Sequence, residues 1–337
     1  MTSPTSPSCW ALSDARAGNR RQAEALARAL GAQFETRCLV LREPWNTFAP
    51  RLTIGAHHAI HDASGAPLAP PWPDIAIGCG RRAALATRLL HRWSGGRTFT
   101  VQILDPRIDA RAFDVVIAPQ HDRIRGGNVI ASIGALNPVD AAWLAEGRTA
   151  FAPLAALPSP RTAVLIGATS RAQTLDALYF RALAERLRAW HADGGGSFLV
   201  STSRRTPSDV VQEIRAAFAT LPGPFWSGPD DGPNPYAGFL GWADRIVVTP
   251  DSVNMISEAC ATGKPVYTFA PRPIGGKLAE FHRELRVSGH LRLIDDTSQR
   301  PLPPPLRETR EIAALVRQRW VATMLAAPDL ASHDTSE

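Results

Sequence analysis

The residues best suited to chemistry lie together in one segment, residues 245–269. Its pattern predicts a strand, a tight polar turn at Pro-Asp-Ser, a helix over residues 252–261 and a second strand. A helix N-terminus binds phosphate because its backbone amides and its dipole both favour negative charge. We therefore interpret this turn as a diphosphate-binding site. The candidate ligands are Asp251 and the amides of Ser252, Val253 and Asn254.

Glu258 lies about two turns further along the predicted helix, where its carboxylate would accept hydrogen bonds from ribose hydroxyls. Val253, Ile256 and Cys260 form the predicted buried stripe. The alternative is purely structural: Asp251 or Ser252 caps the helix and Glu258 is solvated. The spacing leaves both interpretations open.

Three further loops follow predicted strands and would complete the site at the carboxyl edge of a parallel sheet. The first offers small residues that let a ligand approach the backbone, the second two guanidinium groups that suit a diphosphate, and the third a cation. Polar loops after strands are common, so each one alone is a weak signal. The candidates are Gly167, Thr169 and Ser170; Ser203, Arg204 and Arg205; and Lys277, with Lys264 as a second cation.

The first half of the chain has the same placement of polar loops with different chemistry, which is typical of an acceptor site. A carboxylate or an imidazole there could act as general base on an acceptor hydroxyl. The candidate bases are Asp14, His121 and Asp122; turn formation and helix capping are the alternative for each. The other predicted loop residues are Gly18, Asn19, Gln22, Gly80, Arg81, Arg82 and Asn137.

Short hydrophobic runs alternate with amphipathic stretches in both halves, which predicts the α/β class with two Rossmann-like lobes facing a cleft. We expect disordered tails at 1–8 and 327–337, an N-terminal acceptor lobe at 9–152 and a proline-rich linker at 153–160. A nucleotide-diphosphate-binding lobe at 161–305 and a helix at 306–326 follow. The main expected strands are 9–12, 34–41, 74–77, 98–104, 113–118, 162–166, 197–201, 245–249 and 266–269; the helices are 20–30, 81–93, 174–191, 207–219 and 252–261.

The composition of the chain limits the classes of binding partner to expect. The chain has 337 residues, a formal net charge of +6, four dispersed cysteines and 7% aromatic residues. No RNA-binding aromatic signature or zinc-finger spacing accompanies the positive charge, so we expect anionic small molecules as partners and no nucleic acid. No signal peptide or membrane-spanning run is evident, and we expect a cytoplasmic protein. Peripheral contact with the inner membrane stays open.

Several motifs are absent. The sequence has no GxGxxG after its first strand, no P-loop, no GxSxG and no DxD pair. The cluster at residues 57–62 contains three histidines but lies in a proline-rich region without a second ligand group. We therefore expect no cofactor and no metal.

Many short blocks, in the same order along the chain, resemble the "elongated mitochondria" family of mitochondrial fission proteins. The matching blocks are residues 10–19 with Gln22, 78–82, 119–122, 134–137, 201–207, 234–236 and 251–255. The resemblance implies a fold like that of GT-B glycosyltransferases, in which the 252–253 amides contact diphosphate and Glu258 contacts ribose. Bacterial members are often labelled nucleoside-diphosphate-sugar epimerases, and plant members are associated with recruiting a fission GTPase. One departure is Ala168, where a second glycine is expected after Gly167.

Three functions follow from these observations. The first is a metal-independent glycosyltransferase that binds a nucleotide sugar and passes the sugar to an acceptor, a membrane-surface or lipid-linked one being an option. The second is a nucleoside-diphosphate-sugar epimerase, which acts without an acceptor. The third is a recruitment or scaffold protein with a protein partner and no turnover.

Overall fold

A computed structural model describes residues 6–170, 172–296 and 300–326. Within these residues the chain forms two compact units. The first contains the chain up to Ser132 and the final helix from Glu308; the second is Ile133–Arg307. Of the predicted tails, residues 1–5 and 327–337 lie outside the described residues, and Ser8 already begins the first strand.

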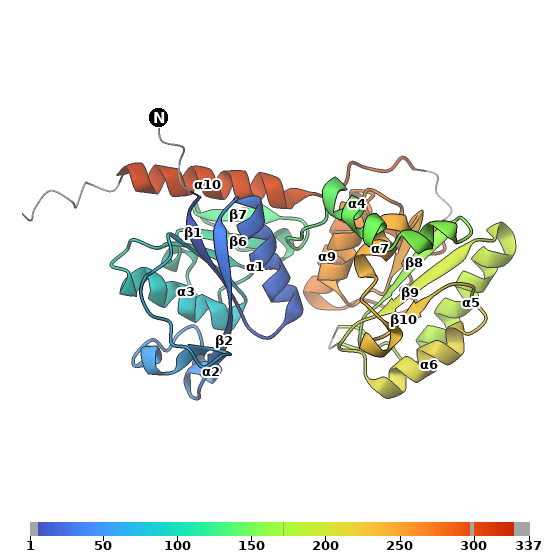
Figure 1. Cartoon of the computed structure of the whole chain (residues 1–337), viewed down its shortest axis with the longest axis horizontal. Coiled ribbons are helices and arrows are strands. Elements are labelled where there is room, and N and C mark those ends of the chain that lie inside the picture. The colour runs from blue at the N-terminus through green and yellow to red at the C-terminus, as the bar shows by residue number, and fades with distance from the viewer. Residues whose placement is uncertain (1–5, 171, 297–299, 327–337) are drawn as a thin grey trace, which may run out of the picture. The chain divides into compact units, whose positions relative to one another are not determined.

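The first unit is built on a seven-stranded sheet in the order β3-β2-β1-β4-β5-β6-β7 (Figure 1). Its strands are β1 (Ser8–Ser13), β2 (Gln33–Leu41), β3 (Ile60–Asp62), β4 (Ile75–Cys79), β5 (Phe99–Ile103), β6 (Val115–Pro119) and β7 (Val129–Ser132). Only β3 is antiparallel to its neighbour, β2. The strand order reverses direction between β1 and β4, which is the Rossmann-type switch point.

Two helices, α1 (Ala17–Ala29) and α3 (Arg81–Trp93), pack on this sheet. The unit also contains the short α2 (Trp45–Phe48) and α10 (Glu308–Ala326). Trp10 and Leu12 of β1 point into the cluster formed with α3, so the alternate residues of β1 face α1. The final helix α10 packs on α1, and the guanidinium of Arg317 donates a hydrogen bond to the Leu30 carbonyl.

The second unit has a six-stranded, fully parallel sheet in the order β10-β9-β8-β11-β12-β13. The strands are β8 (Arg161–Ile166), β9 (Ser197–Thr202), β10 (Phe225–Trp226), β11 (Arg245–Val248), β12 (Val266–Thr268) and β13 (Arg292–Leu293). Numbered within the unit, this is the Rossmann order 3-2-1-4-5-6, with the switch point between β8 and β11. The predicted class, two Rossmann-like α/β lobes, is confirmed.

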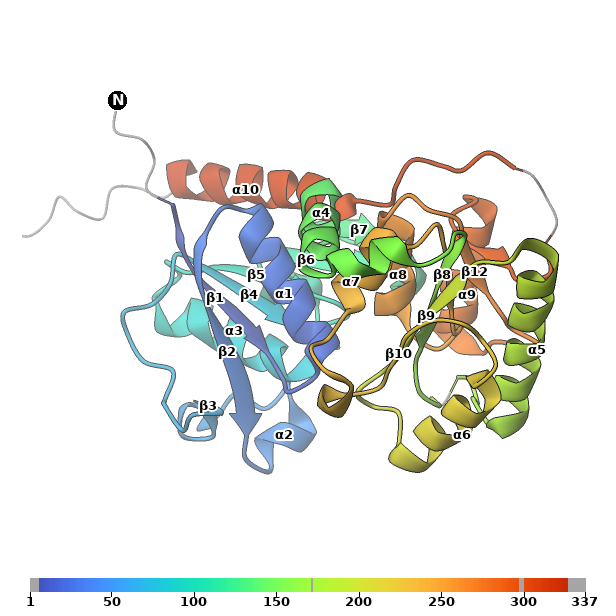
Figure 2. The same cartoon turned by 45° about the vertical axis from the view of Figure 1, so that its right-hand side comes forward.

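Alternation along the strands of the second sheet separates two hydrophobic layers. Val164 and Ile166 of β8 pack with α5 (Ala177–Gly194) and α6 (Ser208–Phe218). Ala163 and Leu165 pack on the opposite face with α7 (Tyr236–Trp242), α8 (Val253–Ala261) and α9 (Gly276–Val287). Figure 2 shows α5 and α6 side by side on one face of this sheet.

The unit boundary lies before the predicted linker, because α4 (Ala141–Ala150) packs on α7 of the second unit. Glycines make this contact possible. A Cβ on Gly147 would lie 2.4 Å from the Ala237 carbonyl oxygen, and one on Gly238 would lie 2.5 Å from the Phe151 Cβ. Part of the predicted linker forms a 3₁₀ turn at Ala152–Ala156 inside the second unit.

In the part of the chain that the structure describes, no helix combines the length and the apolar content needed to cross a bilayer.

The packing of α10 predicts a clear difference between two neighbouring apolar residues. Ile312 is 4% exposed, whereas Leu315 is 45% exposed. Ile312→Ala should lower the free energy of unfolding of the first unit by about 2–4 kcal/mol, because it leaves a cavity beneath α10. Leu315→Ala should change it by less than about 0.5 kcal/mol. Denaturant unfolding of both variants checks this, and equal effects would contradict the docked position of α10.

Candidate functional site

The loops that follow β8 and β11 meet at the switch point of the second sheet and are joined there by hydrogen bonds. The Gly167 amide donates to the Thr249 hydroxyl at 2.8 Å, and the Ala168 amide donates to Asp251 Oδ2 at 3.0 Å. The Thr249 hydroxyl in turn donates to Asp251 Oδ1 at 2.6 Å. The Asp251 carboxylate therefore bridges the two loops at the place where ligands of Rossmann-type sheets bind.

Only glycine fits at position 167, because the Asp251 carboxylate lies so close to the backbone there. A Cβ on Gly167 would lie 2.1 Å from Asp251 Oδ2, which no side chain tolerates. The loop after β9 is tied to the same residue, because the Thr206 hydroxyl donates to the Gly167 carbonyl at 2.9 Å. Three of the loops that the sequence predicted to cooperate are thus joined around one glycine.

Asp251 is electrostatically unusual. Burial raises the pKa of its carboxyl, while the hydrogen bonds from Thr249 and Ala168 and the nearby charge of Arg205 act in the opposite direction. The carboxylate occupies the Ala168 amide, so that amide is not available to a phosphate. The predicted role of Asp251 as a diphosphate ligand is therefore unsupported by its position, because its side chain is an internal anion.

The N-terminus of α8 begins beside this carboxylate. Ser252 is its N-cap, and the Ser252 hydroxyl accepts a hydrogen bond from the Met255 amide at 3.4 Å. The capping role that the sequence left open for Ser252 is present. Among the described residues the Val253 amide has no hydrogen-bond acceptor, which leaves it able to bind an anion. Asn254 lies in the same first turn, half-buried.

Glu258 lies two turns into α8 and is only 3% exposed. Its Oε2 accepts a hydrogen bond from the Tyr236 hydroxyl at 2.5 Å. The interpretation of Glu258 as a solvated residue is therefore wrong, because α8 turns this carboxylate inward beside α7. Ile256 and Cys260 are buried as predicted, and Val253 packs against the same core.

The hydroxyls predicted in the loop after β8 fold the loop itself. Thr169 Oγ1 bonds to both the amide and the carbonyl of Leu175, and Ser170 Oγ accepts from the Gln173 amide at 3.2 Å. Ser203 does the same in the loop after β9, where its hydroxyl accepts from the Arg205 amide. These three hydroxyls thus shape their loops. Thr169 uses its donor and its acceptor in doing so, whereas Ser170 and Ser203 only accept and can still donate to a ligand.

The predicted cations divide into two groups. Arg204 and Arg205 are exposed beside the switch point, and neither pairs with a carboxylate of the described chain. Lys277 lies in the first turn of α9, on the same edge of the sheet. The prediction for Lys264 is wrong: it precedes β12, at the opposite edge, and its Nζ donates to the carbonyls of Leu240 and Gly241 at the end of α7.

The first unit repeats this arrangement, with the neutral amide of Asn19 against the glycine and the Asp14 carboxylate beside it. Asp14, directly after β1, accepts hydrogen bonds from the Arg16 amide and from Asn19 Nδ2. Asn19 lies against Gly80, where a Cβ would be 2.6 Å from its Nδ2 and φ is +87°. Gly18 precedes Asn19 in the first turn of α1, and Gln22 is buried one turn later. The turn-forming role of Asp14 is present, and its role as a base stays a prediction.

His121 and Asp122 follow β6, three strands away from β1 in the sheet. At the usual spacing of strands this separates them from Asp14 by about 14 Å, so the two groups cannot act on the same acceptor atom. His121 is buried and Asp122 is half-buried.

Two predicted acceptor residues have other roles. The Arg81 guanidinium donates to the carbonyls of Asn46 and Thr47, so it holds the segment around α2; Arg82 beside it is half-buried. Asn137 belongs to the second unit, and its side chain closes a turn through Ala135 and Val139. Asn137 therefore does not belong to the predicted acceptor lobe, and the role of Arg81 in acceptor binding stays a prediction.

Gln173 was not among the residues predicted for the site. It is 4% exposed, and neither its Oε1 nor its Nε2 has a hydrogen-bond partner among the described residues. The hydroxyls of Thr202 and Thr268, the last residues of β9 and β12, are buried without partners in the same way. A polar residue at the end of a strand is the only sequence signal for them, and it does not separate buried from exposed groups.

Among the described residues, no group of three or more histidine, cysteine, aspartate or glutamate side chains is placed to hold a metal ion.

Comparison with known proteins identifies the family. The model of the mitochondrial fission ELM1 family matches residues 17–320, and the chain belongs to this family. It is 34% identical over 278 residues to the mitochondrial fission protein ELM1 of Arabidopsis thaliana. That match covers 74% of this chain and 64% of the plant protein, so the chain spans less than two thirds of this relative.

The fold is that of GT-B proteins. The UDP-GlcNAc 2-epimerase of Methanocaldococcus jannaschii superposes with a TM-score of 0.53 at 10% identity, covering 92% of this chain and 99% of the epimerase. The enzyme of Neisseria meningitidis, solved with UDP-GlcNAc, gives 0.52 at 12% identity, covering 93% and 100%. At these identities the likeness concerns the fold.

Two glycine substitutions test the switch-point geometry. Gly167→Ala forces the Asp251 carboxylate out of its place and breaks charge-assisted hydrogen bonds, so it should lower the free energy of unfolding of the second unit by about 2–3 kcal/mol. Gly194→Ala, at the end of α5 where a Cβ meets nothing within 4 Å, should leave it unchanged or raise it by up to about 1 kcal/mol. Urea unfolding monitors both, and a neutral Gly167→Ala would disprove the contact.

Proposed function

We propose that the second unit binds a nucleoside-diphosphate sugar and that the protein is a metal-independent glycosyltransferase. The observation that carries the proposal is the pairing of an uncovered amide at the start of α8 with a buried carboxylate, Glu258, two turns along the same helix. The amide suits a phosphate and the carboxylate suits the two hydroxyls of a ribose. The GT-B fold and the UDP-GlcNAc in the Neisseria enzyme support this ligand class.

The charges around the turn fit a diphosphate better than a single neutral ligand. Arg204 and Arg205 lack carboxylate partners in the described chain and lie on the loop that joins Gly167. They would offset the repulsion between a diphosphate and Asp251, whose raised pKa already lowers its tendency to be charged. Lys277 would add a third positive charge from the start of α9.

In the proposed reaction an acceptor hydroxyl attacks the anomeric carbon, and the bond from that carbon to the diphosphate oxygen breaks. The electron pair leaves with the nucleoside diphosphate, which the α8 amides and the arginines stabilise. The acceptor proton passes to a base of the first unit: Asp14, or His121 or Asp122. A membrane-surface or lipid-linked acceptor is part of this proposal.

Family membership favours a second candidate, a recruitment protein that keeps the fold without turnover, because the plant relative is a mitochondrial fission protein. An epimerase is the third candidate. Sugar nucleotide incubated alone discriminates the two enzymes: an epimerase changes the configuration of the sugar with no acceptor, and a transferase does not.

Nucleotide binding should be detectable as an increase in the melting temperature of the protein. UDP, or another nucleoside diphosphate in a panel, should raise the melting temperature of the full chain, because a ligand that binds only the native state stabilises it. The shift should persist in EDTA. Absence of any shift at millimolar concentration across the panel would exclude both enzyme functions.

Glu258→Gln tests the ribose contact. The amide keeps the shape of the side chain but removes the charge, so the dissociation constant for the bound nucleotide should rise roughly tenfold, which is about 1.4 kcal/mol. Glu185→Gln, an exposed change on α5, is the control and should have no effect. Calorimetry measures both constants; in a recruitment protein, partner capture would be the same for the two variants.

A further inference from the structure

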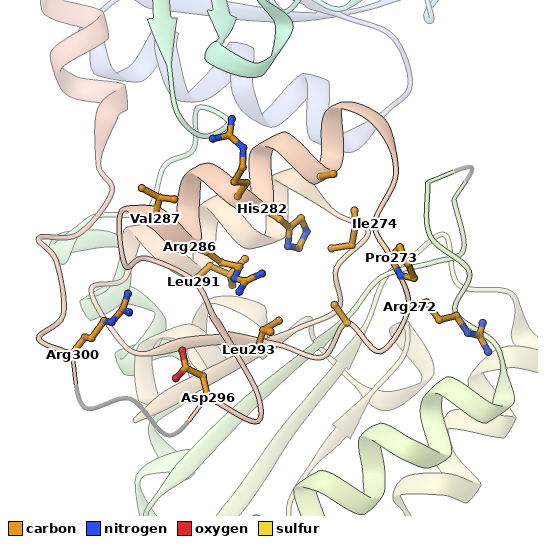
Figure 3. A pocket seen from close by; sticks show the side chains of 13 residues that line it. Arg272, Pro273, Ile274, His282, Arg286, Val287, Leu291, Leu293, Asp296 and Arg300 are labelled. Atoms are coloured by element: carbon orange, nitrogen blue, oxygen red, sulfur yellow. The ribbon is translucent and has the colours of Figure 1, made fainter.

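A pocket of about 600 Å³ opens on the second unit, apart from the residues of the proposed nucleotide site. It lies between α9, the segment that follows β12, and β13, and Figure 3 shows its side chains. Ile274, Leu291 and Leu293 give it an apolar surface. Arg272, Arg283, Arg286 and Arg300 line it against one carboxylate, that of Asp296.

Two of these arginines on α9 have no internal counter-charge. Arg272 is paired with Asp176 at 2.8 Å, but the guanidinium groups of Arg283 and Arg286 form no hydrogen bond or ion pair with a described residue. In Figure 3 the Arg286 side chain points toward the centre of the pocket, close to Leu291. Both arginines are exposed, and a guanidinium binds phosphate or carboxylate well because its planar fork of N–H groups forms paired, charge-assisted hydrogen bonds.

His282 supplies the second observation. It lines the pocket, is 4% exposed, and its Nε2 lies 2.8 Å from the Pro250 carbonyl oxygen. A carbonyl only accepts, so Nε2 carries the proton. Burial, and then the charge of Arg286, lower the pKa of this imidazole, so the ring is neutral at pH 7 and Nδ1 is an acceptor. Nδ1 is buried and has no partner in the described chain.

A buried acceptor without a donor costs folding free energy, and in native proteins it usually has a ligand or water partner. The donor that Nδ1 lacks can be a hydroxyl. A phosphorylated polyol has all three groups that the pocket suits. Its phosphate is an anion for Arg286, one of its hydroxyls can donate to His282, and its short carbon chain fits the apolar surface.

We propose that this pocket binds a phosphorylated polyol such as glycerol phosphate, as a free metabolite or as the headgroup of a phospholipid. The phosphate pairs with Arg286, a hydroxyl donates to His282 Nδ1, and the carbons lie against Leu291 and Leu293. The site is separate from the nucleotide site, since none of the residues assigned to that site lines it.

The first experiment titrates the full chain with glycerol 3-phosphate by calorimetry, with inorganic phosphate and glycerol as partial ligands. Glycerol 3-phosphate should bind at least several-fold more tightly than either. Arg286→Gln should weaken its binding tenfold or more, whereas Arg181→Gln, an exposed change on α5, should not. UDP should not displace it, so the result is separable from the outcome at the nucleotide site.

His282→Gln tests the hydroxyl contact, and ¹⁵N spectra of the histidine rings provide a measurement that does not depend on that variant folding. Ligand should shift the His282 Nδ1 resonance as it gains a donor. Absence of saturable binding, equal binding of phosphate alone, or an unchanged Nδ1 resonance would overturn the proposal.

Vesicles identify the source of the ligand. Phosphatidylcholine vesicles with phosphatidylglycerol should bind the wild-type chain but not Arg286→Gln if the headgroup is the ligand, and glycerol 3-phosphate should then compete. Binding of free glycerol 3-phosphate without vesicle binding assigns the pocket to a metabolite. Vesicle binding that Arg286→Gln retains, with no free-ligand binding, contradicts the pocket.

Discussion

The placement of the Asp251 carboxylate against Gly167 is the constraint on which the candidate site depends. It fixes the separation of the loops after β8 and β11, and through Thr206 it also fixes the loop after β9. Burying a carboxylate is costly, and here the cost is offset by an amide and a hydroxyl donor. The start of α8, which follows Asp251 directly, therefore has a defined position before any ligand arrives, and preorganised donors bind charge at lower cost.

The first unit positions the loops at its switch point with a different side chain. Its switch point also places a polar side chain against a glycine, but the group is the neutral amide of Asn19 at Gly80. Asp14 then accepts from that amide and stays 12% exposed at its side chain. The group packed against the glycine thus differs between the two switch points, a neutral amide at the first and a carboxylate at the second, although an aspartate lies at both.

Much of this architecture could be predicted from the sequence, because both halves contain apolar residues at regular helix and strand spacing, separated by clear turn residues. Prediction from the sequence failed for the elements and residue roles that depend on tertiary contacts. The strands β10 and β13 have two residues each, which is too short to show an alternating pattern of apolar residues. Helix α7 contains Gly238 and Gly241, which lower helix propensity but allow α4 to pack closely. The role of Asp251 depends on a hydrogen bond to a residue 83 positions away. The assignment of Lys264 could have been excluded from the sequence, because this lysine precedes the predicted strand 266–269 and so lies at its amino end, away from the carboxyl edge.

Several polar groups are buried at the carboxyl edge of the second sheet. Burying Glu258 and the Gln173 amide, which has no partner among the described residues, costs folding free energy relative to apolar residues of the same size, whereas the hydrogen bonds of Asp251 join the loops after β8 and β11. His282 connects this edge to the arginine-lined pocket, because its Nε2 holds Pro250, the residue before Asp251. A ligand that fixes the His282 ring from the pocket side would also restrain the turn at 249–252. Binding at the two sites would then be coupled, and thermodynamic linkage requires each ligand to change the affinity of the other by the same factor.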